Sequence, residues 1–226
     1  MSELLTHLLE SQALDELIDN EGRRHEVNQL REWQCKRLMT SYNELYSQKR
    51  FAPAMDFFIK ELYGPNDFSQ RDNDLKKAVP LMEAALSEKT LGTLDVALKL
   101  NTLSFKLDFE LVKQLDNADC INSERYALAY QACDNHIDRQ LQLEFIELLA
   151  HELNKIANRT SIMMVLKLSR VPANLAGLSE LQRILETGAS AFRKIGKIDE
   201  FINPILTGET ELMQNLFAGI NSLPEI

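Results

Sequence analysis

The sequence predicts an all-α protein, and three features of its composition support this fold class. Leucine outnumbers valine by 37 residues to 6, which favours helices over strands. Only eight glycines and six prolines interrupt the 226 residues. No stretch alternates apolar and polar residues in the manner of a half-buried strand. We therefore expect a single multi-helix bundle of about eight to ten helices with an N-terminal helical extension.

Apolar periodicity and helix-breaking residues divide the chain into two predicted units. Residues 1–22 form an N-terminal amphipathic helix that ends at Gly22, and residues 23–226 form the helical bundle domain. No linker rich in glycine, serine or proline divides the second unit. Its helices are expected at about 24–48, 53–62, 69–88, 90–116, 123–158, 160–169, 178–196 and 198–217.

Turn chemistry predicts the ends of the helices in the first half of the bundle. Gly64 suits the left-handed position that ends a helix, and Pro65 prevents continuation. Ser69 and Asp72 resemble a capping box for the next helix, which Pro80 is expected to kink or split.

The second half contains the longest predicted helix, 123–158, with Ser123 as its N-cap. The last helix, 198–217, is expected to be interrupted by Pro204 and Gly208.

The charge of the chain argues against nucleic acid as a partner, and its cysteine content indicates the compartment. The chain has 25 Lys+Arg against 34 Asp+Glu and a formal charge of −9, the wrong sign for nucleic acid. No apolar run is long enough to span a membrane, and the N-terminus does not resemble a signal peptide. Three widely spaced cysteines favour a reducing compartment. We expect a cytoplasmic protein that binds neither nucleic acid nor membrane.

The segment 90–116 carries an unusual line of polar residues. Asn101, Ser104 and Asp108 fall on the apolar side of this predicted helix, where unpaired polar groups would be costly. They either line a ligand pocket, with Asp108 as a buried acid, or hydrogen bond to neighbouring helices. Arg71 and Arg170 are the expected counter-charges for Asp108, because each lies among apolar residues and can bind a carboxylate through two hydrogen bonds.

Residues 57–75 contain the run F-F-x-x-E-L-Y-G-P-x-D-F-S-x-R-D-x-D-L. This run resembles the signature of an uncharacterised family of bacterial all-helical proteins, and the similarity covers roughly residues 28–218. The resemblance implies a helical fold, and it implies no known activity, cofactor or catalytic residue. Residues 1–24 are extra relative to that family pattern.

Motifs for metal binding and catalysis are not found in the chain. None of the four histidines follows a glutamate at the spacing of a carboxylate-bridged metal site, so we expect no metal. Nucleophile elbows, phosphate-binding loops and dinucleotide fingerprints are missing as well. The sequence indicates no catalytic residue and leaves any cofactor unknown.

Two hypotheses for the function remain. The leading one is a cytosolic, non-enzymatic helical protein that binds a protein partner or a small ligand. The alternative is an enzyme or ligand-binding protein with a buried polar pocket around Asn101, Ser104 and Asp108. The N-terminal helix either packs on its own bundle or serves as a homodimer arm or partner-binding helix.

Overall fold

Helices form the regular structure of the part of the chain described by the computed structural model. The structure describes residues 3–65, 69–85, 87–115 and 118–226, without the side chains of residues 69–72, 81, 85 and 119. No strand occurs within these ranges, which confirms the predicted all-α class. The α-helices are α1 (Glu3–Asn20), α2 (Arg24–Ser41), α3 (Asn43–Tyr46), α4 (Ala52–Phe57), α5 (Ser69–Ala85), α6 (Glu88–Gln114), α7 (Ser123–Cys133), α8 (His136–Ala157), α9 (Thr160–Leu168), α10 (Arg170–Leu175), α11 (Ser179–Ile195) and α12 (Asp199–Phe217). A π-helix, η1 (Phe58–Tyr63), and a 3₁₀ turn, η2 (Ala118–Cys120), complete the set.

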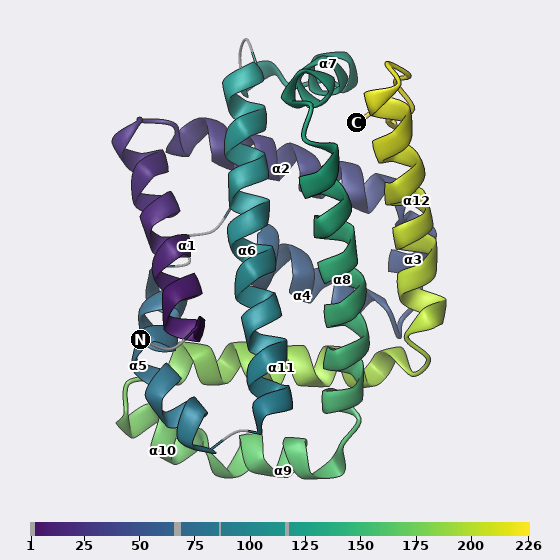
Figure 1. Cartoon of the computed structure of the whole chain (residues 1–226). Helices are drawn as coiled ribbons and strands as arrows, with labels where there is room; N and C mark the ends of the chain where they lie inside the picture. The colour runs from purple at the N-terminus through teal and green to yellow at the C-terminus, as the bar shows by residue number, and fades with distance from the viewer. Residues whose placement is uncertain (1–2, 66–68, 86, 116–117) are drawn as a thin grey trace.

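The long helices α6 and α8 lie side by side and form the centre of the bundle (Figure 1). Helix α1 lies along α6 on one side, and α12 lies along α8 on the other. Helix α11 crosses below them and also contacts α4, while α9 and α10 form the lower edge of the view. This arrangement leaves one side of α9 and α10 without a neighbouring helix.

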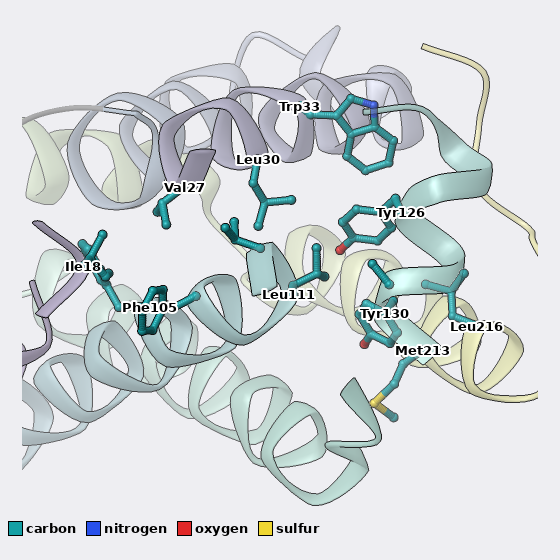
Figure 2. Close-up of a cluster of buried hydrophobic side chains, with 13 residues drawn as sticks. Ile18, Val27, Leu30, Trp33, Phe105, Leu111, Tyr126, Tyr130, Met213 and Leu216 are labelled. Carbon is teal, nitrogen blue, oxygen red and sulfur yellow. The ribbon is translucent and has the colours of Figure 1, made fainter. Parts of the chain in front are cut away.

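The largest apolar cluster joins α1, α2, α6, α7 and α12 (Figure 2). Trp33 of α2 stacks on Tyr126 of α7 with the ring centroids 4.5 Å apart. Leu111 of α6 and Leu216 of α12 are buried in the same cluster. Helices distant in sequence are thus held together by one continuous set of side chains.

The N-terminal helix packs on its own bundle, which is one of the two expected arrangements. Leu4 and Leu8 of α1 are 5% and 1% exposed, and they lie in an apolar cluster with Val79 of α5 and Leu98 of α6. Gly22, with φ +68°, ends the chain's first helical segment as predicted.

Two predicted helices are each broken in the structure. The predicted helix 123–158 was wrong as a single element, because Asp134 adopts a left-handed conformation with φ 47° between α7 and α8. Aspartate tolerates this conformation better than most residues, since its short side chain can hydrogen bond locally. The N-cap of α7 is Asn122 in place of Ser123, since the Asn122 side chain accepts a hydrogen bond from the Arg125 amide. The predicted helix 24–48 divides at Tyr42.

Prolines and glycines have different effects from those expected at four positions. Gly64 has φ −56° and ψ 175°, and not a left-handed conformation, because the residue before a proline is driven to extended backbone. Pro80 and Pro204 lie inside the uninterrupted helices α5 and α12. Both face solvent, where water can satisfy the carbonyl that loses its partner. Gly208 does not interrupt α12 either. The predicted capping contact between Ser69 and Asp72 lies outside the described side chains.

Candidate functional site

The predicted polar line on α6 does not converge on one site. Asn101 donates from Nδ2 to Oγ of Ser11 on α1 at 2.9 Å. Ser104 accepts from Nε2 of Gln142 on α8 at 2.9 Å. Asp108 pairs with α2, so the three side chains contact three different helices. Each hydrogen bond fixes α6 against one neighbour.

The counter-charge of Asp108 is Arg31, which sequence analysis missed. Arg31 Nε donates to Asp108 Oδ2 at 2.9 Å, and the two side chains are 3% and 2% exposed. The guanidinium also lies over the Phe105 ring, 3.6 Å from its centroid. The helical spacing of Arg31 with the buried residues Val27 and Leu30 would have indicated its buried position.

The two arginines expected beside Asp108 are not seen there. Arg170 lies on the exposed side of α10, and its Nε donates to Oε1 of Glu186 on α11 at 2.6 Å. The expectation that Arg170 pairs with Asp108 was wrong, because α10 lies at the lower edge of the bundle and α11 supplies a nearer carboxylate. The side chain of Arg71 lies outside the described part of the structure.

Tyr63, the last residue of η1, extends the buried network. Its hydroxyl lies 3.1 Å from Asp108 Oδ1 and also hydrogen bonds to Oε1 of Gln34. Gln34 in turn donates from Nε2 to the hydroxyl of Tyr126 at 3.2 Å. Burial, followed by the charge of Asp108, raises the pKa of Tyr63 well above its ordinary value. The hydroxyl therefore stays protonated, and its one hydrogen is shared between the Asp108 and Gln34 oxygens.

A second buried ion pair joins α2 to α12. Arg37 pairs with Glu209, which also accepts a hydrogen bond from the Tyr42 hydroxyl at 2.7 Å. Burial and the neighbouring Glu209 charge raise the pKa of Tyr42. Gly208 allows this contact, because a Cβ there would lie 2.7 Å from the Tyr42 hydroxyl.

Arg139 of α8 is a third buried arginine, and its surroundings differ. Its guanidinium carbon lies 4.6 Å from the centroid of the Tyr130 ring, and Nη1 is 3.4 Å from Oε1 of Gln142. Neither Nε nor Nη2 has a hydrogen-bond partner among the described residues. The described interior thus contains ion pairs and hydrogen bonds that hold helices in register. It also contains the Arg139 cation, two nitrogens of which lack a hydrogen-bond partner.

A shallow groove of about 170 Å³ lies elsewhere, between the start of α6 and the end of α8. None of the predicted site residues lines it; its lining is Lys89, Gly92, Thr93, Val96, Leu148, Leu149 and Glu152. Within the described ranges, no three histidine, cysteine, aspartate or glutamate side chains gather as metal ligands. No described helix is both long and apolar enough to cross a membrane.

The outer side of α9 and α10 is an exposed apolar surface that sequence analysis also missed. It consists of five side chains that are 58–86% exposed, and we refer to them as the α9–α10 face: Met164, Val165, Leu168, Val171 and Leu175. The opposite side of α9 packs toward α8 and α11. Apolar residues on both sides of one short segment would have indicated this second surface, because a helix apolar all round is normally covered.

Polar contacts to α11 hold the α9–α10 face in place. Gln182 of α11 donates from Nε2 to the carbonyl of Leu166 at 2.6 Å. Its Oε1 accepts a hydrogen bond from Oγ of Ser169 at 3.1 Å. The ion pair of Arg170 with Glu186 adds a third contact. Gly177, with φ +70°, then turns the chain into α11. The face is therefore supported by a helix of the bundle.

These observations define an all-α bundle protein with buried ion pairs between its helices and an uncovered apolar face on α9 and α10. Residues 13–222 match the family model described as Domain of unknown function (DUF8198), and the chain belongs to this family. This finding agrees with the expected membership of an uncharacterised family. The match begins inside α1, upstream of the expected limit at residue 28. No curated protein and no solved structure matches the chain.

Proposed function

We propose that this protein acts by binding another protein, and that the α9–α10 face is the contact surface. The observation that carries this proposal is the exposure of five clustered apolar side chains on two consecutive helices. Single exposed apolar residues are common on soluble proteins, whereas a contiguous exposed group indicates an interaction site. Its methionine and leucines can repack against a partner helix.

The pocket hypothesis for Asn101, Ser104 and Asp108 has less support. The three side chains hydrogen bond to Ser11, Gln142 and Arg31 on three different helices. A ligand pocket would need them to converge with unpaired atoms. We therefore favour a structural role for these three residues.

The proposed surface also differs from the N-terminal helix that the sequence suggested as a dimer arm or docking helix. Leu4 and Leu8 of α1 are engaged with α5 and α6, so a partner would have to displace these contacts. The α9–α10 face can be covered without any rearrangement. We also propose that the protein is bacterial and cytoplasmic: the resemblance to a bacterial family suggests the origin, and the free thiols Cys35, Cys120 and Cys133 suit a reducing compartment.

A pair of charge substitutions on the face tests this proposal. Leu168→Glu and Leu175→Glu in the full chain should remove a partner that co-purifies with the wild-type protein from its own cells. Both side chains are exposed, so the thermal unfolding midpoint should stay near that of the wild type. Ile137→Glu is the matched control, because Ile137 is 84% exposed on α8, outside the face. Equal recovery of the partner by all four proteins would contradict the proposal.

A further inference from the structure

We infer that the partner presents an acidic amphipathic helix to the α9–α10 face. This inference rests on the proposed function and adds the chemistry of the occupant. The shape of the face indicates a helix, and the charges beside it indicate carboxylates.

The shape comes from the spacing of the exposed side chains. Met164, Leu168, Val171 and Leu175 follow one another at intervals of four, three and four residues. This is the spacing of one line along a helix. Ser169 stays in helical backbone with φ −79° and ψ −6°, so the line continues from α9 into α10. A second helix packed along this line can contact all four side chains.

The segment that carries the face has no acidic residue of its own. Residues 153–179 contain no aspartate or glutamate, although the whole chain has a formal charge of −9. Lys167 is exposed and makes no ion pair with a described residue, whereas Arg159 lies away from the face, beside Glu152 at the groove between α6 and α8. Arg170 is already bound to Glu186. A partner with carboxylates along one flank would therefore find the Lys167 ammonium beside an apolar surface.

Two other occupants fit the same surface less well. A two-fold contact with a second copy would bring each surface against itself, so Lys167 would approach cations of the partner copy. An anionic membrane is the second, and the five side chains of the face include no tryptophan or phenylalanine to anchor it in a lipid interface.

Three synthetic helical peptides with the same apolar face test the inference on the full-length protein. Their flanking positions carry glutamate, glutamine or lysine, and binding is measured by fluorescence anisotropy at low and physiological salt. The glutamate peptide should bind at least about fivefold more tightly than the lysine peptide, with a difference that shrinks as salt rises. Lys167→Glu should reverse the order. Lys36→Glu, on the remote helix α2, is the matched control and should leave the order unchanged.

The other outcomes distinguish the charge of the partner, the kind of occupant and the docking face itself. Equal binding of all three peptides, abolished by Leu168→Glu, would overturn the acidic partner and keep the docking face. If the glutamate peptide does not bind at about 100 micromolar, a concentration at which even a weak interface forms, the inference of an acidic helical partner is overturned. A dimer in sedimentation that Leu168→Glu dissociates would replace the partner with a second copy. Binding to phosphatidylglycerol vesicles that Leu175→Glu abolishes would replace it with a membrane. Partner capture unaffected by the face variants would overturn the proposed function itself.

Discussion

Arg31 of α2 and Asp108 of α6 form a buried ion pair, with Nε and Oδ2 2.9 Å apart. The two residues are 77 positions apart in the chain, and neither has an appreciable exposed surface. Removing one member of such a pair leaves the other charge buried without compensation. The pair therefore fixes the position of α2 against α6.

The first prediction concerns the acid of this pair. Asp108→Asn should lower the free energy of unfolding by about 3–5 kcal/mol, because the Arg31 cation stays buried. The double variant Arg31→Met, Asp108→Leu should recover much of this loss, since it removes both charges. Urea denaturation of the wild type, Arg31→Met, Asp108→Leu and the double variant measures the coupling between the two side chains. A stable Asp108→Asn protein that loses a bound small molecule would instead support the pocket hypothesis.

The second prediction separates the two other buried arginines. Arg37→Met should cost about 3 kcal/mol, because it leaves the Glu209 carboxylate without its partner. Arg139→Met should cost less than about 1 kcal/mol, because the two unpaired nitrogens of this guanidinium already lack hydrogen bonds. Chemical denaturation under the same conditions compares the two variants. A larger loss for Arg139→Met than for Arg37→Met would show that Arg139 has an anionic partner in solution.

The third prediction uses two glycines in helices. A Cβ at Gly188 of α11 would lie 2.6 Å from Cζ of Phe57 on α4, so Gly188→Ala should destabilise the fold by about 1–3 kcal/mol. A Cβ added at Gly92 of α6 would meet nothing within 4 Å. Gly92→Ala should therefore stabilise the protein by about 0.5–1 kcal/mol through helix propensity. Thermal unfolding of both variants gives the comparison, and a gain in stability for Gly188→Ala would refute the close contact.

The fourth prediction is a pH dependence of the contact between α10 and α11. The hydrogen bonds from Arg170, and then from Gln182, lower the pKa of Glu186 to about 2 from the ordinary value of 4.5. A lowered carboxyl pKa contributes stability above pH 4.5, and this contribution is lost as the pH falls toward 2. Near pH 7, the thermal unfolding midpoint of the wild type should therefore be higher than that of Glu186→Gln. The two midpoints should approach one another between pH 4.5 and pH 3. A constant difference across this range would contradict the role of the Glu186 charge.

Local sequence patterns predicted the all-α class and the approximate places of most helices. The apolar side of residues 88–114, for example, is clear enough in the sequence to predict α6. Periodicity could not locate the break at Asp134, because the segments on either side both continue a helical pattern. It also predicted an interruption at Pro204 that α12 does not have, because the backbone there faces solvent.

The buried position of Asp108 follows from local sequence alone, because this residue falls on the apolar side of its helix. Its pairing with Arg31, and the pairing of Arg170 with Glu186, depend on contacts between helices far apart in the chain. The same holds for the α9–α10 face, since the pattern of residues 160–175 shows two apolar sides but not which of them α8 and α11 cover. Apolar periodicity indicates which side of a helix is buried. It does not indicate which helix covers that side, because this depends on the packing of helices distant in sequence.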